Sequence, residues 1–157
     1  MDSAAHSPIL PYPSALTSSD DAGDACVVWP VDLTTTSRVR TARALLRQAT
    51  EQAMSTTRRR GRLRHLVIIY RCMPRLRVRL RGVATALARH LHAEIELSRA
   101  RYLDVVVLDA TGADGNLLDR RIHELANQSA GIVGYAAIPW EDLATESIRS
   151  VCTRGVI

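Results

Sequence analysis

The stretch "YLDVVVLDA", residues 102–110, decides the fold class of this chain. Its central residues, 105–108, are apolar without alternation, which is typical of a strand buried on both faces. Strands of this kind lie in the middle of parallel sheets that helices cover on both sides. "HLVIIY", residues 65–70, is a second apolar run and is rich in β-branched side chains. Both runs therefore predict inner strands of a parallel sheet.

The segments around these runs alternate between strand and helix patterns. "CVVWPV", residues 26–31, contains Pro30 and is expected to be an edge strand. Further strands are expected at 93–98 and 130–138, and helices at 37–53, 83–92, 117–128 and 141–153. This order predicts a single α/β domain over residues 26–157, with a largely parallel sheet flanked by helices. Residues 1–25 are rich in Ser, Pro, Ala and Asp and are expected to be a disordered, flexible N-terminal tail.

Positive charge is concentrated in residues 38–81. They contain fourteen Arg and one Glu, a net charge of +13, whereas residues 1–37 carry −5 and residues 82–157 carry −3. All 21 basic residues are Arg and Phe is absent, which is typical of a GC-rich gene, so the placement of the arginines is more informative than their number. This placement indicates a surface that binds a polyanion, most simply nucleic acid; the alternative is a basic face packed beside the acidic third of the same fold.

The densest part of this region is "PRLRVRLRG", residues 74–82, in which four arginines alternate with Leu76, Val78 and Leu80. A period of two predicts a strand with all four guanidinium groups on one face. A helix that begins near Pro74 fits equally well, because proline is favoured in the first turn and the leucines recur at helical spacing. The pattern does not decide between strand and helix for residues 75–81.

We predict a nucleic-acid-binding site on the arginines that flank the strand at 65–70. They are Arg58, Arg59, Arg60, Arg62, Arg64, Arg75, Arg77, Arg79 and Arg81. Guanidinium groups bind phosphates bidentately, and the chain has only two Trp and four Tyr for base stacking. Binding is therefore expected to be electrostatic and weakly sequence-specific, to RNA or single-stranded DNA. No GxSxG, GxGxxG or Walker motif is present, so neither catalysis nor a cofactor is expected.

A second hypothesis starts from "YLDVVVLDATGADGNLLDRRIHEL", residues 102–125, which resembles the third strand, loop and helix of response-regulator receiver domains. The resemblance implies an acidic site with Asp109 as phosphoacceptor, next to a loop that ends in Asp114 and Gly115. Tyr70 and Arg71 stand where receivers have an acidic pair for Mg²⁺, and the chain has no Lys. The resemblance therefore implies a pseudo-receiver, a regulatory interaction module without phosphotransfer.

In such a module, residues 58–81 would bind an acidic protein partner or a second copy in a homo-oligomer. The structural alternative for the acidic residues is simpler: Asp109 ends a strand and Asp114 caps a helix.

A third hypothesis rests on His90-Leu91-His92, which resembles the His-hydrophobic-His metal motif of rolling-circle nickases and transposases. In a strand, His90, His92, Glu94 and Glu96 would share one face and could hold a divalent metal. The resemblance offers Tyr135 as the nucleophile. The alternative is two solvent-facing histidines near the end of a helix.

Cysteine usage and apolar runs bear on the compartment. Cys26, Cys72 and Cys152 stand far apart and form no CxxC pattern. The N-terminus lacks the basic and apolar regions of a secretory signal. No apolar run approaches the roughly 20 residues that span a bilayer. We therefore expect reduced thiols, a cytoplasmic location and no membrane partner.

Overall fold

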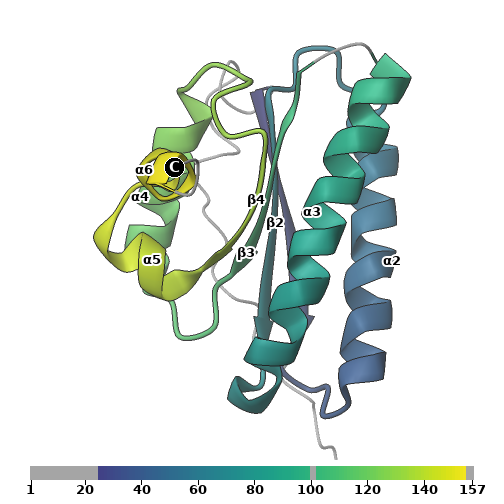
Figure 1. The fold of residues 1–157 in the computed structure, drawn as a ribbon, viewed down its shortest axis with the longest axis vertical. Helices are drawn as coiled ribbons and strands as arrows, with labels where there is room; N and C mark the ends of the chain where they lie inside the picture. The colour runs from purple at the N-terminus through teal and green to yellow at the C-terminus, as the bar shows by residue number, and fades with distance from the viewer. Residues whose placement is uncertain (1–24, 100–101, 155–157) are drawn as a thin grey trace, which may run out of the picture.

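Four parallel strands form the centre of the structure, a computed structural model that describes residues 25–99 and 102–154 (Figure 1). In spatial order they are β1 (Cys26–Leu33), β2 (His65–Cys72), β3 (Asp104–Asp109) and β4 (Tyr135–Pro139). The predicted α/β fold is confirmed, and the sheet is parallel throughout. The tail predicted at residues 1–25 lies outside the described residues, except for Ala25, which is buried.

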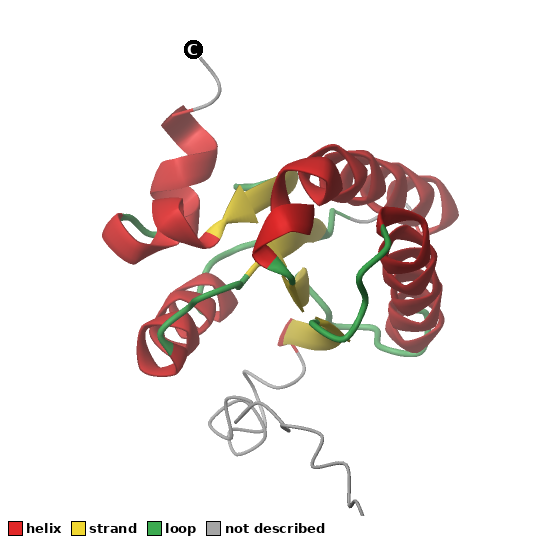
Figure 2. Ribbon diagram, turned by 90° about the horizontal axis from the view of Figure 1, so that it is seen from below, coloured by secondary structure: helices red, strands yellow, loops and turns green. Residues whose placement is uncertain are grey.

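Helices cover both faces of the sheet (Figures 1 and 2). One face carries α2 (Val39–Thr57) and α3 (Arg77–Arg99). The other face carries α4 (Gly115–Ala126), α5 (Trp140–Thr145) and α6 (Ile148–Arg154). β2 and β3 are therefore the inner strands, and this position explains why their sequences are apolar on both faces.

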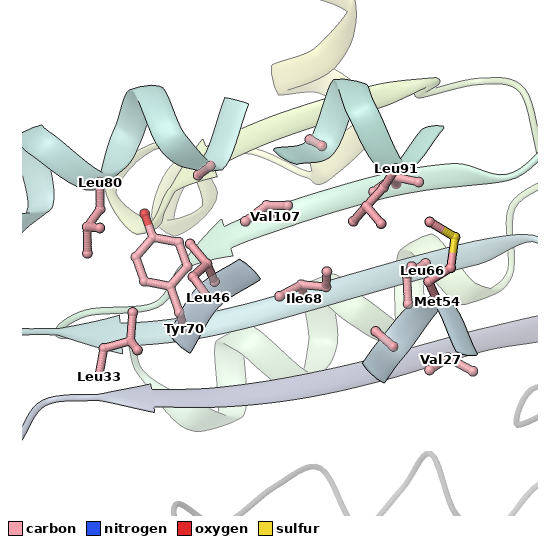
Figure 3. Close-up of a cluster of buried hydrophobic side chains, with 14 of the residues drawn as sticks. Val27, Leu33, Leu46, Met54, Leu66, Ile68, Tyr70, Leu80, Leu91 and Val107 are labelled. Atoms are coloured by element: carbon pink, nitrogen blue, oxygen red, sulfur yellow. The ribbon is translucent and has the colours of Figure 1, made fainter. Parts of the chain in front are cut away.

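Two apolar cores result from this arrangement, one on each side of the sheet. On the α2–α3 side, Leu46, Leu80 and Leu91 pack over Ile68 and Val107 (Figure 3). On the other side, α4 buries Leu118, Ile122 and Leu125 against the opposite-facing residues of β2 and β3. Alternate residues of each inner strand thus enter different cores.

The three crossovers do not share one hand. All three advance in the same direction across the sheet, but α2 and α3 cover one face whereas α4 covers the other. The β3–α4–β4 crossover therefore has the opposite hand to the first two, although parallel crossovers overwhelmingly take one hand. As a consequence, the chain leaves the neighbouring ends of β2 and β3 toward opposite faces, an arrangement that opens ligand crevices in α/β sheets.

Residues 74–82 are helical. Pro74–Leu76 form a 3₁₀ helix, and α3 begins at Arg77. The helical alternative is correct because Leu76, Leu80 and Ala84 all pack into the core on one stripe. A strand would have placed these residues together with Val78, which is 76% exposed.

The strand predicted at 93–98 is wrong, because α3 continues through these residues to Arg99. Ile95 stays on the buried stripe one turn after Leu91, and this packing extends the helix. The helix predicted at 141–153 is two short helices, α5 and α6, separated at Glu146 and Ser147. β4 begins only at Tyr135, because Gly131 and Gly134 before it adopt positive φ angles of 90° and 69°.

Candidate functional site

The nine arginines predicted as one site lie at two ends of the molecule. Those at 58–64 precede β2 and those at 75–81 follow it, so the strand separates them by roughly 26 Å. Arg64 is half-buried, and its Nη2 donates to the carbonyl of Ala126 at 3.1 Å. The nine side chains therefore do not form a single continuous surface.

The four arginines of 75–81 also separate, because residues four apart share a side of a helix. Arg77 and Arg81 face the end of β3 near Asp109, whereas Arg79 faces α2 and lines a groove between the two helices. Arg77 Nε donates to Oδ2 of Asp109 at 2.8 Å, and its two terminal nitrogens donate to Glu141, one of them at 2.7 Å. Hydrogen bonds to Glu141 and Asp109 raise the pKa of Arg77, and the Arg77 hydrogen bond lowers the pKa of Glu141 to about 2. We call Arg77, Asp109 and Glu141 the Arg77 bridge.

The Arg77 bridge lies beside the end of β3, where the chain leaves the sheet toward α4. Asp109 is 8% exposed, and its second oxygen accepts from the backbone N–H of Thr111 at 3.0 Å. Its carboxylate is thus engaged on both sides and does not face an open cleft. The strand order β1–β2–β3–β4 also lacks the reversal of the receiver order 2-1-3-4-5. Asp114 caps α4, because its side chain accepts from the N–H groups of Asn116 and Leu117.

The two histidines of the third hypothesis lie on α3, not on a strand, so the strand interpretation is wrong. Two residues apart on a helix, they point to different sides. His90 is exposed, and its Nε2 lies 3.3 Å from Oε2 of Glu94. His92 lies 3.5 Å from Glu96, and its ring centroid lies 5.7 Å from that of Tyr135. Within 25–99 and 102–154, no group of three or more His, Cys, Asp or Glu could hold a metal ion.

A groove of about 890 Å³ runs along the outer side of the α2–α3 pair. The α2 wall is lined by Arg43, Arg47, Glu51, Ser55 and Arg58, and the α3 wall by Arg79, Gly82, Ala86, His90 and Glu94. The floor consists of Thr50, Met54, Val83, Leu87 and Leu91. From Arg43 to Arg58 the α2 wall extends for roughly 22 Å.

Charge is distributed unevenly along this groove. At the far end of the groove, where α2 ends, Nη2 of Arg58 lies 3.4 Å from Oε1 of Glu94. The same carboxylate also contacts His90. At its near end, where both helices begin, the groove is lined by Arg43, Arg47 and Arg79. In the part of the chain that the structure describes, these three arginines form no ion pair. The near end is therefore an uncompensated positive surface.

The beginnings of α2 and α3 reinforce this positive charge. The two helices are parallel, so both N-termini lie at the near end of the groove (Figure 1). Neither helix has an acidic residue in its first turn, and the N-cap Arg38 of α2 makes no side-chain capping hydrogen bond. Arginines at helix N-termini oppose the helix dipole, at about 0.3–1 kcal/mol each, and an anion would relieve this repulsion.

We call Arg40, Arg43, Arg47, Arg75 and Arg79 the arginine face. All five are exposed and lie on the first turns of α2 or immediately before and within the first turn of α3. Of these five, only Arg75 and Arg79 belong to the site predicted from the sequence. Arg40, Arg43 and Arg47 fall off the apolar stripe of α2, so the sequence does indicate that they are exposed. Their proximity to residues 75–79, however, depends on how two helices pack.

A buried histidine–aspartate pair at the amino-terminal ends of the inner strands was also missed. His65 and Asp104 start β2 and β3 in direct register, both are 0% exposed, and His65 Nδ1 lies 3.3 Å from Oδ2 of Asp104. His65 Nε2 donates to the Gln128 carbonyl at 2.8 Å. Asp104 Oδ1 accepts from the N–H groups of Gly131 and Gly134 at 3.0 and 2.9 Å.

Burial alone would raise the pKa of Asp104, but the His65 contact and the two backbone hydrogen bonds lower it below its ordinary value. A pair without solvent access cannot reach a substrate. We therefore assign it a structural role: it holds the loop between α4 and β4 against the sheet.

The chain matches no model of a known protein family, no curated protein and no solved structure. None of its described helices combines the length and apolarity needed to cross a bilayer.

Proposed function

We propose that this protein binds nucleic acid, RNA or single-stranded DNA, through the arginine face, with weak sequence specificity and without chemistry of its own. The observation that carries the proposal is the convergence of Arg43, Arg47 and Arg79, which lack an ion-pair partner in the described structure, at the N-termini of two parallel helices. The three cysteines are free, which supports a reducing, cytoplasmic setting.

Binding would be dominated by the phosphate backbone. Each guanidinium offers two parallel N–H groups to a phosphate, and each neutralised phosphate releases counterions. The arginine face presents no aromatic side chain on which bases could stack. The affinity should therefore depend strongly on salt and only weakly on base sequence.

Fluorescence anisotropy with a labelled single-stranded 20-mer at four salt concentrations tests the proposal. If all five arginines reach phosphates, log K should fall with log salt at a slope of about −3.5, since each phosphate contributes about −0.7 on a single strand. Affinity would then fall about 130-fold between 50 and 200 mM salt. Tight binding with a slope shallower than about −2 would contradict the electrostatic account. No binding at 50 mM salt would favour an acidic protein partner instead.

A further inference from the structure

Gly82 stands in the interior of α3 without a structural reason. It is exposed, its φ is not positive, and a Cβ added there would meet no atom within 4 Å. Neither backbone geometry nor close packing therefore requires glycine. Glycine in a helix interior destabilises the helix relative to alanine, so this position lowers stability with no gain inside the chain.

The position of Gly82 in the groove suggests that the glycine serves binding and not folding. Gly82 lines the α3 wall one turn after Arg79, and Ala86, also small and exposed, follows one turn later. Together they lower this wall and expose the half-buried side chains of Val83 and Leu87. The result is a recess with an aliphatic base beside the arginines at the near end of the groove.

We propose that this recess receives an unstacked nucleobase of a single strand whose phosphates lie on the arginine face. This inference rests on the proposed function and specifies the class of nucleic acid. A duplex keeps its bases paired and stacked inside, whereas a single strand can turn a base outward against a protein surface. The positive charge of Arg43, Arg47 and Arg79 complements the phosphate backbone. The aliphatic base of the recess can pack against the flat face of a nucleobase.

The small size of the exposed floor argues against an amphipathic helix as the occupant. Thr50, Met54 and Leu91 are only 3%, 6% and 2% exposed, so the apolar surface is confined to the area around Val83 and Leu87. A docked helix needs apolar contacts over several turns, whereas a base needs an area of about one ring.

The Gly82→Leu variant tests this inference, because a Cβ at this position meets no atom within 4 Å and a leucine side chain would occupy the recess. Gly61→Leu is the matched control: Gly61 is also exposed with no atom within 4 Å of an added Cβ, but it lies outside the groove. Anisotropy is measured for each variant with a labelled single-stranded 20-mer and with the duplex of the same sequence, and melting temperature is measured in parallel.

We expect the wild type to prefer the single strand. Gly82→Leu should weaken single-strand binding about fivefold or more, leave duplex binding unchanged, and raise the melting temperature by about 2–3 °C. Gly61→Leu should leave single-strand binding unchanged. Single-strand affinity that survives Gly82→Leu, or a wild type that binds duplex equally well, overturns this inference but leaves the proposed function intact. A wild type that binds neither nucleic acid overturns both.

Discussion

Arg77 and Arg79 are two residues apart on α3, but their substitution should have very different consequences for stability. Arg77 is 21% exposed and bonded to the nearly buried Asp109, whereas Arg79 is exposed and forms no ion pair among the described residues. Arg77→Ala would leave the Asp109 carboxylate with the Thr111 N–H as its remaining hydrogen-bond donor in the described structure. Breaking a fully buried ion pair costs about 3–5 kcal/mol.

The partial exposure of Arg77 makes this cost smaller. Arg77 retains some water, and its contact with Glu141, which is 58% exposed, counts as a surface pair worth about 0–1 kcal/mol. We therefore expect Arg77→Ala to lower the free energy of unfolding by about 2–3 kcal/mol and Arg79→Ala to change it by less than about 0.5 kcal/mol. Urea denaturation followed by circular dichroism measures both values.

A double-mutant cycle with Asp109→Asn isolates the pair, because the cost of losing Arg77 should shrink once the buried charge is gone. If Arg77→Ala destabilises the protein no more than Arg79→Ala does, the Arg77 bridge does not stabilise the fold. The expected result also means that charge reversals that include Arg77 cannot report on nucleic-acid binding, because they would disturb the fold.

Three further outcomes are expected elsewhere in the molecule. Because the folded pKa of Asp104 lies below its ordinary value of 3.8, its stabilising contribution is complete above that pH and is lost as the pH falls through the folded pKa. Urea denaturation should therefore show a steeper loss of stability as the pH falls below about 4 for the wild type than for Asp104→Asn, and parallel curves would refute this. Burial raises the pKa of Cys26 to about 12, so iodoacetamide at pH 8 should label Cys26 only after unfolding; mass spectrometry that finds it labelled in the native protein would contradict its burial. Asp114→Ala removes the α4 cap and should cost about 1 kcal/mol, a fall of about 3 °C in melting temperature that calorimetry can detect.

Local sequence patterns predicted the inner strands well, because β2 and β3 are buried on both faces and must be apolar along their length. Residues 75–81 remained ambiguous since alternating Arg and Leu satisfies both periods over so short a stretch. At residues 93–98 strand spacing competes with helical spacing through Leu87, Leu91 and Ile95, and the packing of Ile95 in the core decides for the helix. No local sequence pattern indicates the hand of the β3–α4–β4 crossover.

The site was harder to predict than the fold. Nearby arginines in the sequence were assumed to be nearby in space, but β2 separates residues 58–64 from 75–81. Arg43 and Arg47 reach Arg79 only because two crossovers place α2 and α3 in parallel on one face. The pairing of His65 with Asp104 depends on strand register, which neither residue reveals by itself.

The most direct test of the central claim compares two double charge reversals. Arg47→Glu with Arg79→Glu lies on the arginine face, and Arg59→Glu with Arg62→Glu lies in the exposed loop before β2. Both alter the net charge of the chain equally, so any difference in anisotropy with a single-stranded 20-mer at 50 mM salt reflects position. We predict that the first variant loses about 100-fold or more in affinity and that the second loses less than about threefold, with both folded by circular dichroism. Equal losses, or a larger loss from the loop variant, would contradict the assignment of the binding surface to α2 and α3.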